Sequence, residues 1–363
     1  MKMPWTMYLY FGRRALMAIA ASFIICMALA FVIDFVELLR RTGSREVPFT
    51  TVLSMGLLRL PSISEKMMPF AVLFGSMWAF LQLSRTNEFV VARASGVSAW
   101  QFLAPAVALA LIIGTGAVAV YNPLAAAMVS RFEALESKYV RGRTSLLAVS
   151  ESGLWLRQAD DNGQSVIHAL GVTNQGVELR DVIIFLYNNE DEFIARINAD
   201  NAELGDGQWK ISNAQVATPG ERRALHETYS LPTSLTLERV QESFASPDTL
   251  SFWELPEFIE TAQEAGFSAL RYELHWHQLA SRPFLMAAMV LIAACFSLRL
   301  TRLGGVGQLI VAGIISGFFL YFFTDVTLAL GARGVMPVVL AAWSPAFISA
   351  MLGGALIFHQ EDG

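Results

Sequence analysis

The chain has 363 residues, of which 54% are hydrophobic and only 16% are charged. Soluble domains carry about 25% charged residues, and the mean hydropathy of +0.47 is also high, so the composition excludes an ordinary soluble protein. The net charge of −5 and the lack of basic clusters with interleaved aromatic residues argue against nucleic-acid binding.

Six apolar segments contain no Asp, Glu, Lys or Arg and reach, or nearly reach, the roughly 20 residues that a helix needs to cross a bilayer. They are residues 15–33, 67–84, 94–130, 283–298, 303–324 and 334–360. We therefore expect six transmembrane helices, three on each side of a polar middle segment. The first segment is too long for the apolar core of a signal peptide and lacks a small-residue cleavage site, so we expect it to be retained.

The middle segment, residues 131–250, has the pattern of an all-β domain. Alternating or β-branched runs such as GLWLRQ, SVIHALGV, DVIIFLYNN, EFIARINADNAEL and QWKISNAQVAT are separated by turn formers such as DDNG and GDGQ. Strands at this spacing predict an antiparallel sandwich or barrel. Residues 251–270 then predict a connecting helix, with Asp248 or Ser251 as its cap and Gly266 as its end.

Residues 1–130 thus hold the first three transmembrane helices, and residues 271–363 hold the last three. Six spans place both termini on one side of the membrane and the β-domain on the other. The distribution of Lys and Arg does not decide which side is cytoplasmic. An extracytoplasmic β-domain is the expectation that we retain.

The segment RTNEFVVARASGVS, residues 85–98, lies between the second and third spans and predicts a short amphipathic helix over about 85–96. Its first turn carries Glu88, where the helix dipole favours an anion, and Gly96 is suited to end it. From the residues alone, it is either an interfacial helix among lipid headgroups or a helix docked in a groove of another protein. The residues assigned to docking are Glu88, Phe89, Val91, Ala92, Ser95 and Gly96.

Motifs for catalysis or nucleotide binding are missing from the sequence, which has no GxxxxGK[S/T] loop, nucleophile elbow or zinc-binding helix motif. Cys26 and Cys295 both lie in predicted spans, so they indicate neither a disulfide framework nor a metal site. His275 and His277 point to different faces of a helix and are poor joint metal ligands. With Trp276, we expect them at the membrane interface. We predict a chain that is not an enzyme and holds no metal.

Gly313 and Gly317, with Ala312 and Ser316 beside them, form a small-residue face on the fifth span. Such faces let helices approach each other closely in lipid. Two uses of this face stay open: packing within the chain, or a helix-packing seam against a second permease chain.

The whole arrangement resembles the LptF/LptG family, the permease subunits of the lipopolysaccharide-export ABC transporter. RTNEFVVARASG is similar to the coupling-helix pattern of that family, in which an acidic residue and two or three apolar residues precede an [A/S]-[C/S]-G ending. The ending ASG and the preceding Asn–Glu look closer to the LptG branch than to the LptF branch. DTLSFWELPEFIETAQEAG and LRYELHWHQLASRPF also resemble the LptG approach to the fourth span.

The resemblance implies six transmembrane helices, three before and three after an inserted, extracytoplasmic, jelly-roll-like β-domain. It implies a Gram-negative inner-membrane protein with cytoplasmic termini that pairs with an LptF-like permease. A cytosolic LptB-like ATPase dimer would bind ATP and Mg and dock on the coupling helices, while this chain itself binds no cofactor. Lipopolysaccharide would pass from a cavity between the permeases toward LptC-like and LptA-like periplasmic β-jelly-roll proteins.

Four charged residues near the end of the first span bear on the substrate. Arg40 and Arg41 either snorkel to the interface or, as the resemblance implies, contact the phosphates of lipid A, which a guanidinium can pair bidentately. Asp34 and Glu37 lie below them as possible cavity acids, and Asp34 departs from the family, which often has a basic residue there. Because acids at that depth usually face a cavity or a partner, we expect Asp34 to pair with a neighbouring basic residue, for which the partner permease is one source.

A function of another class fits the same composition, namely a membrane-anchored periplasmic ligand-binding or scaffold protein. This alternative predicts no ATPase partner and no effect of reversing the charge of Glu88. The β-domain leaves a similar choice open, because it either joins neighbouring β-proteins edge to edge or serves only as a rigid cap.

Overall fold

The computed structural model describes residues 5–43, 47–141, 147–150, 153–160, 163–173, 178–188, 190, 192–205, 207–220, 222–233, 246–264, 268–299 and 306–362. The chain forms two compact units. A helical unit comprises Met1–Val140, Asp248–Trp253 and Glu273–Gly363, and a β unit comprises Arg141–Pro247 and Glu254–Tyr272.

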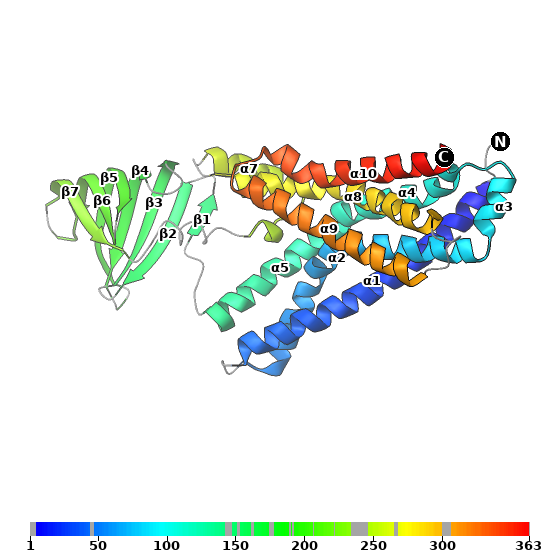
Figure 1. The fold of residues 1–363 in the computed structure, drawn as a ribbon. Helices are drawn as coiled ribbons and strands as arrows, with labels where there is room; N and C mark the ends of the chain where they lie inside the picture. Colours follow the sequence, from blue (N-terminus) through cyan, green and yellow to red (C-terminus); the bar gives the residue numbers. More distant parts are fainter. Residues whose placement is uncertain are drawn as a thin grey trace. The chain divides into compact units, whose positions relative to one another are not determined.

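Among the described residues, six helices of the helical unit are long and apolar enough to cross a membrane (Figure 1). The candidate spans are Trp5–Thr42, Phe49–Arg85, Ala99–Tyr139, Leu270–Ser297, Val311–Ala332 and Val338–His359. Three precede the β unit in the sequence and three follow it, so the predicted arrangement of three plus three spans is confirmed.

The helices of the helical unit follow the chain in a simple order. They are α1 (Trp5–Thr42), α2 (Phe49–Arg85), α3 (Glu88–Ala94), α4 (Ala99–Gly116), α5 (Asn122–Glu136), α8 (Leu270–Arg299), α9 (Val306–Ala332) and α10 (Val338–Asp362). Two π-helical segments, η1 (Ala117–Tyr121) and η2 (Ser137–Arg141), continue the third span without a break. The first of them lies just before Pro123, whose ring cannot donate a hydrogen bond and crowds the preceding turn, which favours a wider turn there.

The apolar core of the helical unit includes fully buried side chains of α2, α4 and α8, among them Leu73, Phe102 and Met286. Helix α9 packs on α2 through its small-residue face. A Cβ added at Gly313 would lie 2.6 Å from the side chain of Met77, and one at Gly317 would lie 3.1 Å from Leu73. Of the two uses that the sequence left open, the structure shows packing within the chain.

The described strands of the β unit form one antiparallel sheet in which neighbours in space are neighbours in the chain. The strands are β1 (Leu147–Ser150), β2 (Gly153–Asp160), β3 (Gly163–Thr173), β4 (Glu178–Tyr187), β5 (Phe193–Gly205), β6 (Gln208–Ala217) and β7 (Ala224–Pro232). Ile184 pairs with Ile167 on one side and with Ile197 on the other, and all three side chains are buried. Because side chains alternate along a strand, this register places one apolar row on the inner face.

Side-chain hydrogen bonds join β2 to the end of β7, across the sheet order. Oε1 of Gln158 accepts from the hydroxyl of Thr233 over 2.6 Å and from the indole of Trp209 over 3.4 Å, and its amide donates to the carbonyl of Pro232 over 3.3 Å. The sheet therefore curves over its own core, which the helix α7 (Leu255–Glu264) also contacts. The predicted all-β insertion is confirmed.

Candidate functional site

The short helix predicted between the second and third spans is α3, and local hydrogen bonds fix both of its ends. The hydroxyl of Thr86 donates to Oε1 of Glu88 over 2.8 Å. At the other end, the hydroxyl of Ser95 donates to a helix carbonyl, and the backbone amides of Gly96 and the next residue close on the last turn. Gly96 has a φ of 84°, as a Schellman motif requires, so the predicted helix end is confirmed.

The two apolar faces of α3 have different surroundings. Phe89 and Ala92 are buried in the core of the chain itself, and the ring of Phe89 lies 4.5 Å from that of Phe102 in α4. Val90 and Val91 are 64% and 66% exposed. One face therefore anchors α3, and the other leaves two adjacent valines uncovered.

The end of α1 carries a compact charge group. The carboxylate of Glu37 accepts hydrogen bonds from both Arg40 and Arg41, each over 2.8 Å. The guanidinium groups are exposed, with 76% and 51% of the side-chain surface open. Two cations share one carboxylate, so the group retains a net positive charge and its arginines are already oriented.

Asp34, one turn below, forms a salt bridge of 2.8 Å with Arg59 of α2. The guanidinium of Arg59 also lies 5.4 Å from the centre of the Phe132 ring, within reach of a cation–π interaction. The expected pairing of Asp34 with a neighbouring basic residue is therefore confirmed, and its partner lies in the same chain.

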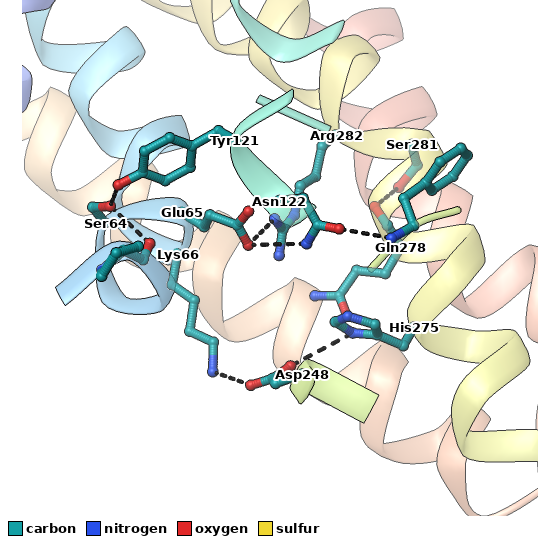
Figure 2. Close-up of polar contacts among 12 residues, drawn as sticks. Ser64, Glu65, Lys66, Tyr121, Asn122, Asp248, His275, Gln278, Ser281 and Arg282 are labelled. Carbon is teal, nitrogen blue, oxygen red and sulfur yellow. Dashed lines mark hydrogen bonds and ion pairs between the residues drawn. The ribbon is translucent and has the colours of Figure 1, made fainter. Parts of the chain in front are cut away.

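A second charged group, which the sequence reasoning missed, lies in the interior of the helical unit (Figure 2). Glu65 of α2 and Arg282 of α8 form a salt bridge of 2.9 Å, and the two residues are 6% and 8% exposed. The side-chain amide of Asn122 also donates to Glu65, over 3.5 Å. This pair ties the first three spans to the fourth.

Asp248 extends this group from η4 (Pro247–Thr249). Its carboxylate accepts a hydrogen bond of 2.9 Å from Lys66 and lies 3.7 Å from Nδ1 of His275 (Figure 2). Burial alone would raise the pKa of Asp248, but the positive charge of Lys66, with smaller contributions from other basic neighbours, outweighs it and holds the pKa below its usual value. Asp248 is therefore ionised at neutral pH.

The expectation that Asp248 caps the connecting helix is wrong, because α7 begins only at Leu255. The carboxylate of Asp248 is instead bound to Lys66. Gly266, the expected end of that helix, lies outside the described residues.

The segment Asp248–Trp253, which we call the return segment, is held by α5 and η1. Oδ1 of Asn122 accepts a hydrogen bond of 2.8 Å from the amide of Phe252, and the indole of Trp253 donates to the carbonyl of Ala119 over 3.1 Å. That carbonyl lacks its helical partner because the residue four positions later is Pro123, which has no N–H. Trp253 therefore satisfies a backbone group that the proline leaves open.

His275, Trp276 and His277, which we predict at the membrane interface, each contact another element of the helical unit. The side chain of His275 is 11% exposed beside Asp248, and Trp276 stacks on Phe252 with ring centres 5.6 Å apart. His277 accepts a long hydrogen bond from α10. Among the described residues, no group of three His, Cys, Asp or Glu side chains could hold a metal ion.

Glu65 and Arg282 escaped prediction because each lies at the edge of a charge-free window. Glu65 precedes the predicted second span by two residues, and Arg282 directly precedes the fourth. A signal was present, since extending the second window toward the N-terminus takes in Lys66 and Glu65, and extending the fourth takes in Arg282. Acids and bases at that depth usually face a cavity or a partner.

The described residues contain six candidate membrane-spanning helices in two groups of three, with an antiparallel β unit inserted between them in the sequence, which indicates a multi-pass membrane protein. The family model of the lipopolysaccharide export system permease LptF/LptG matches residues 9–359. The chain belongs to this family and is a multi-pass protein of the inner membrane.

Relatives of the chain are similar to it over nearly its whole length. The lipopolysaccharide export system permease protein LptG of Haemophilus influenzae is 24% identical over 368 residues, which cover 97% of this chain and 98% of that protein. The protein of the same name from Escherichia coli K12 is 23% identical over 357 residues, which cover 96% and 94%. The predicted family and its LptG branch are confirmed.

Proposed function

We propose that this chain is the LptG-like half of an ABC transporter that extracts lipopolysaccharide from the inner membrane. It pairs with an LptF-like permease, and a cytosolic LptB-like ATPase dimer that binds ATP and Mg drives the pair. Lipopolysaccharide passes from the cavity between the permeases to LptC-like and LptA-like periplasmic proteins. The observation that carries the proposal is the match to the export-permease family over residues 9–359.

In this proposal α3 is the coupling helix and lies in the cytosol with both termini. Its exposed Val90 and Val91 enter an apolar groove on the ATPase, as helices bound in grooves commonly do. Glu88 forms a buried, hydrogen-bonded pair with a basic residue of that groove. Phe89 and Ala92 hold α3 against its own chain, so that movement of the ATPase is transmitted to α2 and α4 instead of being lost in a loose loop.

Glu88→Lys is expected to reduce the ATPase that copurifies with the chain by tenfold or more. Truncating a paired charge at an interface costs about 2–5 kcal/mol, and each 1.4 kcal/mol corresponds to roughly a tenfold change in affinity. The measurement is the amount of ATPase subunit and the rate of ATP hydrolysis after affinity purification of the tagged chain in mild detergent.

Glu257→Lys, on an exposed residue of α7, is the matched control and should leave the copurified ATPase unchanged. Glu88→Gln, which removes the charge without reversing it, should give an intermediate loss. Full retention of the ATPase by Glu88→Lys would contradict docking on α3. A wild-type chain that brings down no ATPase would favour the membrane-anchored scaffold.

Arg40 and Arg41 bind the phosphates of lipid A in this proposal. Glu37 holds both guanidinium groups while the site is empty, and a phosphate takes over as a stronger partner because it carries more negative charge. ATP-driven closure of the ATPase narrows the cavity and drives the lipid toward the β unit. The cavity must differ in size between the open and the closed state of the transporter, because a lipid that binds both states equally does not shift the equilibrium between them.

Replacement of both arginines, Arg40→Gln with Arg41→Gln, is expected to weaken lipopolysaccharide binding by about tenfold or more, because charge-assisted hydrogen bonds to phosphate are lost. The check is the lipopolysaccharide concentration that half-saturates binding to the purified complex, measured for bisphosphorylated and dephosphorylated lipid A. Equal weakening for both lipids would contradict a phosphate contact. Arg13→Gln, on an exposed residue in the N-terminal part of α1, is the control.

A further inference from the structure

A small pocket lies beside the Glu65–Arg282 pair, at the junction of α2, α5, α8 and the return segment. Its lining includes Glu65, Asn122, Asp248, His275 and Arg282. Its volume is about 10 Å³, close to the minimum of ~10–15 Å³ that one water molecule requires.

Two buried polar atoms of this lining have no hydrogen-bond partner among the described residues. One oxygen of Glu65, Oε2, accepts from Arg282 and Asn122 (Figure 2), whereas Oε1 accepts from no donor in the part of the chain that the structure describes. Nε2 of His275 is likewise buried and unpaired. Leaving such groups unsatisfied costs about 1–3 kcal/mol each, and more for a charged group.

We propose that this pocket binds one ordered water molecule, which donates a hydrogen bond to Oε1 of Glu65. The site selects water by its charge balance, because the carboxylates of Glu65 and Asp248 are matched by Lys66 and Arg282. A metal ion would add uncompensated positive charge beside Arg282. A water molecule adds no charge, supplies the missing donor and fits the volume.

The water completes a polar network that links the return segment to the helices. Asn122 connects Glu65 to the amide of Phe252, and Lys66 connects α2 to Asp248. The bound water adds a contact at Glu65, the most buried carboxylate of this network. The return segment is held on the helices by the direct hydrogen bonds of Asn122 and Lys66, and the water stabilises the carboxylate of Glu65 to which Asn122 also donates.

The direct test is a cryo-EM map of the intact transporter in lipid nanodiscs, at a resolution that shows ordered water. The expected result is a single density within hydrogen-bonding distance of Oε1 of Glu65, which Glu65→Met abolishes. An empty pocket, or a density surrounded by several oxygens at metal-ligand distances, would overturn the proposal.

A second test measures whether filling the pocket raises or lowers the Tm of the protein. Ala125 is 2% exposed and lines the pocket, so Ala125→Val displaces a bound water and is expected to lower the Tm of the purified complex by a few degrees. In the background Glu65→Met with Arg282→Met, where the water has lost its charged acceptor, the same change should lower the Tm far less.

The comparison distinguishes water from the alternatives. A dry void gains packing when it is filled, so a rise in Tm for Ala125→Val in the native background would overturn the proposal. An equal loss in both backgrounds would reveal a steric clash and would also overturn it.

Discussion

Arg282→Met is expected to lower the free energy of unfolding by about 3–5 kcal/mol, the range measured when one partner of a buried salt bridge is removed. Glu65 is 6% exposed, and without Arg282 the only described side chain that would still donate to it is Asn122, over 3.5 Å. The uncompensated carboxylate must then be buried without its counter-charge or protonated, and both cost free energy.

The measurement is thermal unfolding of the purified full-length chain in detergent, monitored by tryptophan fluorescence. Lys66→Met is the matched control, because this lysine also pairs with an acid but its side chain is 57% exposed, where salt bridges contribute about 0–1 kcal/mol. The double replacement Glu65→Met with Arg282→Met should recover most of the loss, since no unpaired charge remains. A loss for Arg282→Met no larger than that for Lys66→Met would contradict a buried pair.

The spans could be predicted because their apolar windows match the thickness of a bilayer, but their true ends could not. Helix α8 begins at Leu270, thirteen residues before the charge-free window that predicted it. Likewise α2 begins at Phe49 and contains Arg59, Glu65 and Lys66. A search for charge-free windows ends a span at every charged residue, including one that is paired with another residue inside the protein. The partner of such a residue is known only from the folded structure.

The β unit, too, could be predicted from the sequence only in part. Strands β2 to β6 were predicted because their buried and exposed side chains alternate, as in the run that includes Ile184. Strand β7 (Ala224–Pro232) was not predicted, since it is polar and nearly all of its side chains are exposed. It is held by backbone pairing with β6, for which the sequence carries no periodic signal.

For α3, the sequence predicted the helix and its end but not which apolar residues face inward. Phe89 and Val90 are adjacent and both apolar, and a seven-residue helix is too short for a periodic pattern to separate a core face from an exposed one. The aromatic side chains of the neighbouring helices determine which residue faces inward, because the ring of Phe89 packs against those of Phe102 and Phe80. Similarly, the partners of Asp34 and Glu65 depend on which helices lie side by side.

The two groups of spans approach each other closely at a glycine. Gly114 of α4 faces Pro283 of α8, and a Cβ added at Gly114 would lie 2.5 Å from the Cα of Pro283. Because the obstructing atom belongs to the backbone, no side-chain rotation can relieve the clash, and the helices would have to separate. The position of Arg282, next to Pro283, depends on the same contact.

Gly114→Ala is therefore expected to destabilise the chain by about 3 kcal/mol, the upper end of the range for overpacking. Gly116→Ala is the control on the same helix, because a Cβ there would meet nothing within 4 Å. It should be neutral or stabilise the chain by up to about 1 kcal/mol, since alanine favours a helix over glycine. The two variants add the same methyl group two residues apart, so a difference in Tm between them measures the contact between α4 and α8. Equal values of Tm for the two variants would show that the two groups of spans do not meet at this glycine.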